Sequence, residues 1–440
     1  MKTHIRIKLL CLSITLCLSY SAQSQWSSVM MSSGRFSLAA ASGGEYAVFA
    51  GGIGLISIPP AAADLYNIST ATSSQYTISR GRIDLAAAST GNQLFFAGGS
   101  DDWILSVMDD IDVFETSTAT WSTMQLSVGR TKLVGASIGS KVFFAGGSHP
   151  FASIIYDVVD IYDTATTLWT TSTLSVARHS LAGASANGIV VFAGGADIND
   201  IALNTVDIYD DATSTWATDT LSEPRSNCVA TSVGDKIYIA GGLNSAGKAS
   251  KVIDIYDTST NTWSIDSLSA PRTGLCATST GDMLFFIGGS DATRSTIYDL
   301  VDIYNTTTST WSVSNLTTAR RNAAATSIGD VILVGGGIGA SSPVNTIEIY
   351  SLINSINESK GKTFSLFPNP VSDDINLKLI NSLSDGKIEI IDQTGRIVYS
   401  MELISSTADI NFKANELNAG VYYIKLRDHN TSTSQRFVKL

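Results

Sequence analysis

The chain has 440 residues, of which 44% are hydrophobic and 15% are charged, and its formal net charge at pH 7 is −11. This length and this hydrophobic content predict two or three domains with sizeable cores and exclude an intrinsically disordered protein. The acidic balance provides no basic field for polyanions, so we expect no nucleic-acid partner.

Residues 1–24 have the order of a secretory signal peptide. Lys2, Arg6 and Lys8 precede an apolar run over residues 9–18, and small polar residues follow up to Ser24. The apolar run is too short to span a bilayer as a mature helix. We therefore predict cleavage after Ser24, an exported chain and no transmembrane segment.

Residues 25–352 repeat one pattern seven times. A double glycine recurs every 47 or 48 residues, and an arginine recurs with the same spacings. The glycine pairs begin at residues 51, 98, 146, 194, 241, 288 and 336. The arginines are Arg35, Arg82, Arg130, Arg178, Arg225, Arg272 and Arg320. Two markers in step at this period indicate a repeat architecture.

Within one repeat the pattern is β throughout. After Arg225, residues 227–232 predict a strand of small side chains and residues 236–240 a buried strand that ends at a double glycine. Third and fourth strands are predicted at residues 252–256 and from residue 262. Four short strands separated by Gly, Asp, Asn and Ser are typical of one blade of a β-propeller. Glycine permits the sharp change of direction after the second strand.

A tryptophan stands nine residues before six of the seven arginines. These residues are Trp26, Trp121, Trp169, Trp216, Trp263 and Trp311, and Ser73 takes the remaining position. We expect each indole to fill the space between adjacent blades. The last repeat ends at Tyr350 without a fourth strand, whereas Trp26 precedes the first repeat. We therefore predict that the N-terminal strand completes the last blade and closes the ring.

This spacing resembles the kelch repeat family, in which a double glycine is followed by a Tyr and a Trp seven residues apart, as at Tyr256 and Trp263. The resemblance covers residues 25 to about 352. It implies an all-β fold, a seven-bladed kelch-type β-propeller. The His that often follows the repeat arginine in kelch proteins occurs only once here, at His179.

Residues 353–362 are polar and predict a linker, and residues 363–440 lack the repeat markers. Seven short strands are predicted there, at residues 364–367, 375–379, 387–391, 396–402, 409–412, 421–426 and 436–440. Their alternation predicts a small antiparallel, immunoglobulin-like β-sandwich.

Three ordered markers occur in this C-terminal segment. The first is Phe367-Pro368-Asn369-Pro370, the second is Gly395-Arg396, and the third runs from Leu417 through Gly420 to Tyr422, before a final segment that contains Lys439. Together they resemble the C-terminal sorting domain of type IX secretion substrates of Bacteroidetes-type bacteria. The resemblance implies the type IX secretion machinery as a partner, passage across the outer membrane, removal of the sorting domain and tethering of the cargo to the cell surface. An ordinary immunoglobulin-like module is the alternative.

Few residues offer catalytic or metal-binding chemistry. Beyond the signal peptide only His149, His179 and His429 remain, and zinc requires three or four convergent ligands. A Ser-His-Asp set would depend on His149 or His179. We therefore expect no metal, no cofactor and no enzyme activity. Cys228 and Cys276 are the remaining cysteines, and we expect two buried free thiols, with a disulfide as the alternative.

The third strands carry a second periodic charge. Its members are Asp64, Asp112, Asp160, Asp207, Asp254, Asp302 and Glu348. The third and first strands of a blade start at the same end, so each acid is expected near a repeat arginine. We favour structural ion pairs, and a charged ring that binds ligands is the alternative.

Residues outside the repeat pattern concentrate in the loops between second and third strands. We single out Trp103, Asp101, His149, Phe151, Tyr156, Arg294 and Tyr298, together with His179 after its repeat arginine. Aromatic and polar groups around a propeller mouth suit carbohydrate stacking or peptide docking, and packing of each residue within its own loop is the alternative. The sequence thus favours a secreted or cell-surface protein that binds a glycan or protein. The alternatives are a secreted carbohydrate-active enzyme of the sugar oxidase or epimerase type and a structural surface-layer protein.

Overall fold

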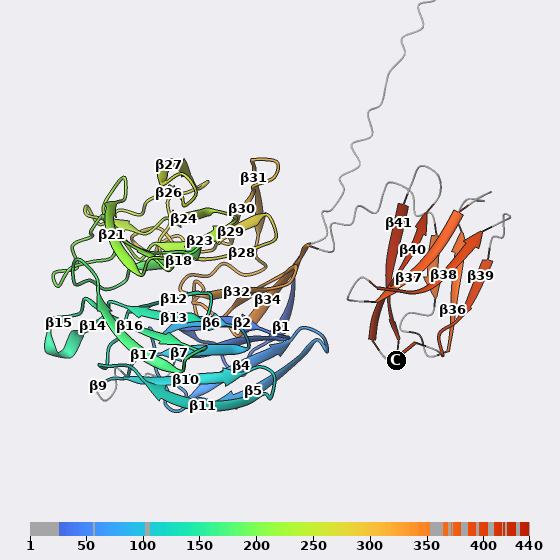
Figure 1. The fold of residues 1–440 in the computed structure, drawn as a ribbon, viewed down its shortest axis with the longest axis horizontal. Coiled ribbons are helices and arrows are strands. Elements are labelled where there is room, and N and C mark those ends of the chain that lie inside the picture. The colour runs from blue at the N-terminus through green and yellow to red at the C-terminus, as the bar shows by residue number, and fades with distance from the viewer. Residues whose placement is uncertain are drawn as a thin grey trace, which may run out of the picture. The chain divides into compact units, whose positions relative to one another are not determined.

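The computed structural model describes residues 26–55, 58–101, 106–352, 364–367, 371, 373–379, 386–392, 396–403, 409–415, 417–418, 420–427 and 432–439. The predicted signal peptide and linker lie outside these residues. The chain divides into two compact units, Met1–Tyr350 and Ser351–Leu440 (Figure 1). No helix in the described part of the chain is both long and apolar enough to cross a membrane.

The described part of the first unit contains seven four-stranded antiparallel sheets, here called blades 1 to 7 in chain order. Blade 1 consists of β2 (Phe36–Gly43), β3 (Tyr46–Ile53), β4 (Ala62–Asn67) and β5 (Thr72–Thr77). Blade 2 consists of β6 (Ala86–Thr90), β7 (Gln93–Ala97), β10 (Asp110–Glu115) and β11 (Thr120–Gln125). Blade 3 consists of β12 (Val134–Ile138), β13 (Lys141–Ala145), β16 (Val158–Asp163) and β17 (Leu168–Thr173). Blade 4 consists of β18 (Ala182–Ala186), β19 (Ile189–Ala193), β20 (Thr205–Asp210) and β21 (Thr215–Thr220).

The remaining blades follow the same order. Blade 5 consists of β23 (Val229–Val233), β24 (Lys236–Ala240), β26 (Val252–Asp257) and β27 (Thr262–Ser267). Blade 6 consists of β28 (Cys276–Thr280), β29 (Met283–Ile287), β30 (Leu300–Asn305) and β31 (Thr310–Asn315). Blade 7 consists of β32 (Ala324–Ile328), β33 (Val331–Gly335), β34 (Thr346–Ser351) and β1 (Trp26–Met30). Short pairs in the loops are β8 (Ser100–Asp101) with β9 (Ser106–Val107), β14 (Ser148–His149) with β15 (Ile154–Ile155), and β22 (Arg225–Ser226) with β25 (Leu243–Asn244), and η1 (Pro150–Ala152) is a 3₁₀ turn.

The N-terminal strand closes the ring, as predicted. In blade 7, β1 pairs with β34, so that Trp26 faces Tyr350 and Met30 faces Thr346. The innermost strands contact one another in an unbroken cycle, from β2 through β6, β12, β18, β23 and β28 to β32 and back to β2. The prediction of an all-β propeller is confirmed, and β1 takes a place that would otherwise leave β34 as an unpaired edge.

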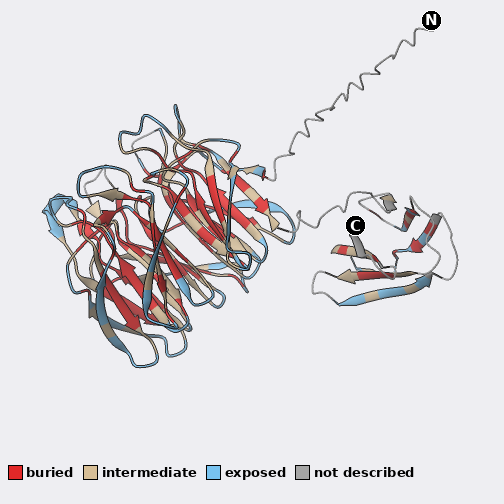
Figure 2. Ribbon diagram, turned by 90° about the horizontal axis from the view of Figure 1, so that it is seen from above, coloured by how far each residue is buried: buried red, intermediate tan, exposed pale blue. Residues whose placement is uncertain are grey.

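Burial follows the position of a strand within its blade. Second strands are fully apolar at their centres, as in β13, because neighbouring blades cover both of their faces. Fourth strands are exposed and rich in Ser and Thr, and all six residues of β5 are exposed. Figure 2 shows this gradient, with red strands inside and pale blue outer edges and loops. Hydrophobic clusters mix neighbouring blades, as where Val191 of blade 4 packs with Cys228 and Ile239 of blade 5.

The double glycines allow close backbone contact between neighbouring blades. Both glycines of every pair have positive φ, for example 63° at Gly194 and 108° at Gly195. The second glycine donates its N–H to the carbonyl of the next repeat arginine, as from Gly195 to Arg225 at 2.9 Å. A Cβ on the first glycine would meet the same carbonyl, 2.3 Å away at Gly194. The glycine and arginine markers are therefore in step because their backbones touch between blades.

The periodic tryptophans lie between blades, as predicted, although most are only half-buried. The Trp263 indole N–H donates to Asp219 of blade 4 at 2.8 Å, and that of Trp311 donates to Asp266 of blade 5 at 2.9 Å. Each ring also packs on the aromatic residue opposite it, as Trp263 does on Tyr256 with ring centroids 4.9 Å apart.

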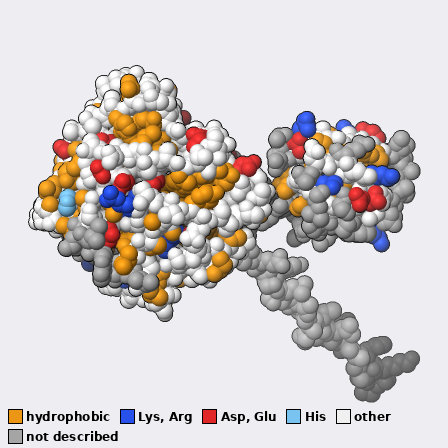
Figure 3. Space-filling view, turned by 90° about the horizontal axis from the view of Figure 1, so that it is seen from below, with side chains coloured by type: hydrophobic (Ala, Val, Ile, Leu, Met, Phe, Trp, Pro, Cys, Tyr) orange, Lys and Arg blue, Asp and Glu red, His pale blue; other side chains and the backbone are white. Residues whose placement is uncertain are grey.

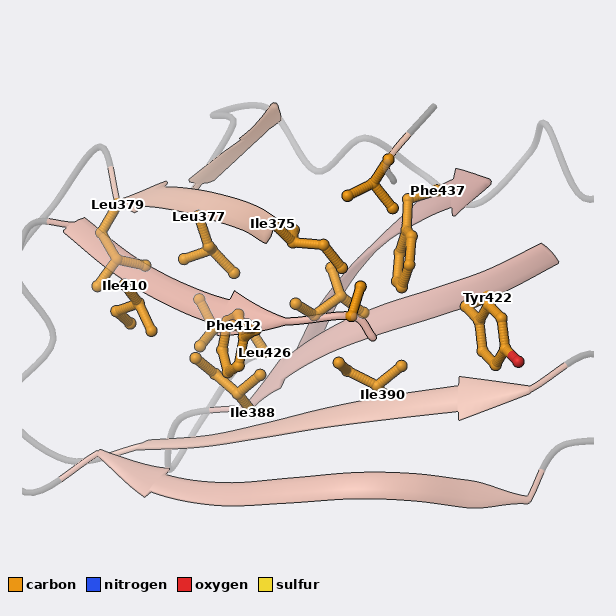
Figure 4. Packing of buried hydrophobic residues seen from close by; sticks show 13 residues of the cluster. Ile375, Leu377, Leu379, Ile388, Ile390, Ile410, Phe412, Tyr422, Leu426 and Phe437 are labelled. Atoms are coloured by element: carbon orange, nitrogen blue, oxygen red, sulfur yellow. The ribbon is translucent and has the colours of Figure 1, made fainter. Parts of the chain in front are cut away.

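The second unit consists of two antiparallel sheets. One contains β35 (Phe364–Phe367), β36 (Asp374–Leu379) and β39 (Asp409–Lys413). The other contains β38 (Ile397–Leu403), β37 (Gly386–Asp392), β40 (Gly420–Arg427) and β41 (Ser432–Lys439). Alternate side chains of both sheets form one core, in which Leu377 and Phe412 face Ile388 and Leu426 (Figure 4). All seven strands predicted for this segment are present, with boundaries shifted by a few residues.

Candidate ligand-binding face

The repeat arginines are internal to the blades. Each is at most 1% exposed and forms an ion pair with the third-strand acid of its own blade. The pairs are Arg35–Asp64, Arg82–Asp112, Arg130–Asp160, Arg178–Asp207, Arg225–Asp254, Arg272–Asp302 and Arg320–Glu348. The nitrogen–oxygen distance is 2.8 Å for Arg130–Asp160. Burial lowers the pKa of Arg130, and the charge of Asp160 opposes this shift.

The same acids also accept hydrogen bonds from the chain segment that leads into each blade. A Ser or Thr three residues before each arginine donates its backbone N–H to the acid, as from Ser79 to Asp112 and from Ser175 to Asp207, both at 2.9 Å. Six of the arginines, all but Arg35 among the described contacts, also donate to backbone carbonyls, as from Arg130 to Phe144 at 2.9 Å. These contacts give the arginine and acid rings a structural role and direct their polar groups into the blades.

A further ring lies two residues after the arginines, at the start of the inner strands. Its members are Ser37, Asp84, Lys132, Ser180, Asn227, Gly274 and Asn322, and all seven have φ between 51° and 63°. Six of the backbone N–H groups in this ring donate to the member of the preceding blade, as from Lys132 to Asp84 at 3.0 Å. We call these seven residues the pocket ring. Sequence reasoning did not identify it. The small or polar residue types at this position, several of which tolerate a left-handed backbone, were the sequence signal that could have identified it.

The pocket ring surrounds a cavity of about 500 Å³ on the propeller axis. All seven ring residues line it, together with the apolar residue that follows each of them in sequence, which is Leu, Cys or Ala. Arg294, from the loop between β29 and β30, also reaches this pocket. The cavity therefore opens on the face that carries the loops between second and third strands.

The predicted loop residues have varied environments. Trp103 lies outside the described residues. Asp101 is half-buried in β8, and Phe151 is exposed beside the His149 ring, with ring centroids 6.1 Å apart. Tyr156 and Tyr298 are half-buried. Arg294 is the one of these residues that lines the central pocket in the described structure.

His179 is buried at the edge of the pocket ring. Its Nε2 lies 3.4 Å from a carboxylate oxygen of Asp200, and its Nδ1 lies 3.0 Å from the hydroxyl of Ser180. Burial lowers the pKa of His179, and the nearby charge of Lys132 adds to this effect. These surroundings therefore disfavour the protonated form of the His179 imidazole.

Other reactive groups are dispersed. No three His, Cys, Asp or Glu side chains of the described residues are placed to share a metal ion. Cys228 and Cys276 are buried free thiols, and burial raises the pKa of Cys276 to about 12. On the face drawn in Figure 3, hydrophobic side chains (orange) emerge on the propeller as small separate patches among polar groups.

The second unit has a cavity of its own, of about 600 Å³. Arg396, Leu417, Asn418 and Tyr422, all from the second and third C-terminal markers, line it. The Tyr422 hydroxyl donates to the Asn418 carbonyl at 3.0 Å. Gly420 begins β40 opposite Lys439, whereas Pro368, Asn369, Pro370 and Gly395 lie outside the described residues. Markers separated in sequence therefore converge on one cavity.

Comparisons with known proteins agree with this architecture. Residues 132–337 match the KLHDC2/KLHL20/DRC7 Kelch-repeats domain, and residues 365–440 match the secretion system C-terminal sorting domain. A search of curated proteins found no match. A solved structure described as "Structure of YjhT" is 15% identical with a TM-score of 0.50, over 60% of this chain and 93% of that chain, which is a likeness of fold alone. The chain therefore consists of a kelch-repeat β-propeller followed by a type IX secretion C-terminal sorting domain, and it is a secreted or cell-surface protein.

Proposed function

We propose that the propeller is a non-enzymatic binding module for a glycan or an extracellular protein, and that its ligand sits in the central pocket. The observation that carries this proposal is the cavity of about 500 Å³, to which all seven blades contribute a ring residue. Concave sites with a few convergent polar groups are the usual form of a ligand site.

The variation within the pocket ring supports a specific ligand. The arginine and acid positions keep their charge in every repeat because each blade needs the ion pair. The ring position instead carries hydroxyl, amide, acidic, basic and side-chain-free residues in different blades. Amides of Asn227 and Asn322 and hydroxyls of Ser37 and Ser180 match the hydroxyl groups of a sugar as donors and acceptors.

A carbohydrate-active enzyme is the second candidate, and one observation favours it. His179 contacts both Ser180, a pocket residue, and Asp200. These residue types support proton transfer when they are in contact. Turnover of a sugar substrate by the purified chain, lost in a His179→Gln variant, would replace the binding proposal with this one.

The sorting domain supplies the export route in this proposal. We infer that the secretion machinery recognises it, and that the domain is removed and the propeller tethered at the cell surface. Convergence of Arg396, Leu417 and Tyr422 on one cavity supports recognition at that place. A structural surface-layer role would instead predict self-association without a ligand.

The experiment is a glycan array probed with the full chain, combined with capture of extracellular proteins. Asn227→Ala and Asn322→Ala variants should lose binding of the ligand that the native chain selects, because each removes polar atoms from the pocket. Lys236→Ala, which changes an exposed lysine paired with Asp257 at the far end of β24, is the control and should bind normally. Ligand binding that survives both asparagine variants would place the site elsewhere, and a chain that binds no ligand would refute the proposal.

A further inference from the structure

One edge of the central pocket concentrates positive charge. Arg294 lines the pocket from the loop of blade 6, and Arg321 stands at the crossover from blade 6 to blade 7, next to the ring residue Asn322. Gly274, the ring member without a side chain, lies beside Arg321 and Asn322. A Cβ at Gly274 would lie 2.4 Å from the Asn322 amide oxygen and 3.7 Å from the Arg321 Cβ.

Neither arginine has an ion pair among the described residues, in contrast to the seven repeat arginines. The Nε of Arg321 is buried and has no hydrogen-bond partner there. Burial lowers the pKa of Arg321, and the positive charge of Arg294 lowers it further. Two neighbouring guanidinium groups without a counter-charge are an arrangement that an anion would stabilise.

The nearest acid in the same loop is already satisfied. Asp291 accepts hydrogen bonds from the Ser295 hydroxyl at 2.6 Å and from the Thr296 backbone at 3.1 Å. These bonds fold the loop so that Arg294 adopts a φ of 62°, which side-chain-bearing residues rarely do. The acidic member of the pocket ring, Asp84, belongs to blade 2, which is as far around a ring of seven as a blade can be from blade 6.

We propose that Arg294 and Arg321 form an anion subsite of the central pocket, and that the ligand is an acidic glycan with a carboxylate or a sulfate ester. This inference rests on the proposed binding function and names its ligand class. The planar guanidinium forks hold the anionic group with paired hydrogen bonds, while the amides and hydroxyls of the ring hold the sugar hydroxyls. A folded protein surface is less well matched, because a cavity of about 500 Å³ has room for one or two sugar rings.

The test is isothermal titration of the full chain with three oligosaccharides of equal length: an oligogalacturonate, a sulfated galactan and a neutral galactan. An array of acidic glycans covers other backbones. The native chain should prefer one of the two acidic sugars, which distinguishes carboxylate from sulfate, and raising NaCl should weaken that binding.

Arg294→Ala should lower affinity for the acidic sugar at least about tenfold and leave the neutral sugar unaffected, as expected for loss of hydrogen bonds to a charged group. Arg294→Lys should be intermediate, because it keeps the charge and loses the fork. Arg80→Ala is the matched control, since this exposed arginine pairs with Asp110 at 3.4 Å and does not line the pocket.

Equal affinity for acidic and neutral sugars, or acidic binding that Arg294→Ala leaves intact, would overturn the anion subsite while glycan binding itself stands. A chain that binds no acidic or neutral glycan would overturn both the subsite and the proposed glycan ligand.

Discussion

At the scale of single residues, the repeat arginine joins three parts of a blade. At Arg130, the guanidinium pairs with the third-strand acid, other nitrogens donate to carbonyls of the second strand and its end, and the arginine carbonyl accepts from the glycine pair of the preceding blade. Because both charges of each pair are buried, removing one leaves the other without compensation. The rings therefore stabilise the blades only as complete pairs.

Asp160→Ala tests this pairing. The variant leaves the Arg130 guanidinium buried and unpaired and should lower the free energy of unfolding by about 3–5 kcal/mol, measured by urea denaturation. A double variant, Arg130→Met with Asp160→Leu, should lose less than the single variant because no buried charge remains. A double variant less stable than Asp160→Ala would contradict this account.

His179 should make stability depend on pH. Burial and Lys132 lower its pKa below the ordinary value of 6.5, so the unfolded chain takes up this proton before the folded chain does. The folded state is therefore favoured above pH 6.5, and this contribution is lost as the pH falls through the lowered pKa. Urea unfolding of the native chain and of His179→Gln at pH 7.5, 6.5 and 5.5 should show a steeper acid loss for the native chain. Equal dependence of the unfolding free energy on pH in the two chains would show that His179 does not cause the loss of stability in acid.

At the scale of elements, the double glycine sets the distance between neighbouring blades. Its first member approaches the arginine carbonyl of the next blade, and no side chain fits between them. Gly188, in the turn between the first and second strands of blade 4, differs because nothing lies within 4 Å of the position of its Cβ. Gly194 and Gly188 thus share a positive φ, and only Gly194 of the two also approaches a neighbouring backbone closely.

Gly194→Ala and Gly188→Ala separate these two effects. Both place a Cβ at positive φ, which costs about 1–2 kcal/mol. Gly194→Ala should cost a further 1–3 kcal/mol or so, since its Cβ would press on the Arg225 carbonyl between blades 4 and 5. Equal loss of unfolding free energy in the two variants would show that blade spacing adapts to the extra carbon.

The elements were largely predictable from sequence because each has a local cause. Alternation marked the strands, and glycine and aspartate marked their turns. The half-burial of the tryptophans was not predictable, since it depends on how far the fourth strand of one blade covers the next. Acceptors such as Asp219 for Trp263 lie three residues after the tryptophan of the preceding blade, a relation visible only once blades are adjacent.

At the scale of the whole molecule, closure depends on a strand from the opposite end of the propeller sequence. β1 pairs with β34, and the Trp26 indole N–H donates to Ser314 of blade 6 at 3.2 Å. Without β1, blade 7 would have three strands, and β34 would be an unpaired edge.

Deletion of residues up to Met31 tests the closure. The truncated chain should unfold at lower temperature and self-associate through the exposed edge of β34, as seen in thermal scans and light scattering. A chain that begins after Ser24 is the control and should remain at the native melting temperature. A truncated chain that stays monomeric with an unchanged melting temperature would show that the ring does not need β1.

The repeat itself determined the propeller, the order of its strands and its closure, and the C-terminal markers determined the position of the sorting domain, because these follow from local sequence patterns and chain order. The pocket ring and the unpaired Arg294 and Arg321 were decided by the tertiary structure. Seven positions separated by 47 or 48 residues meet only when the ring closes, and the loop between β29 and β30 then places Arg294 in the lining of the same cavity. Spacing along the chain records which residues are equivalent, whereas the closed ring decides which of them share a cavity.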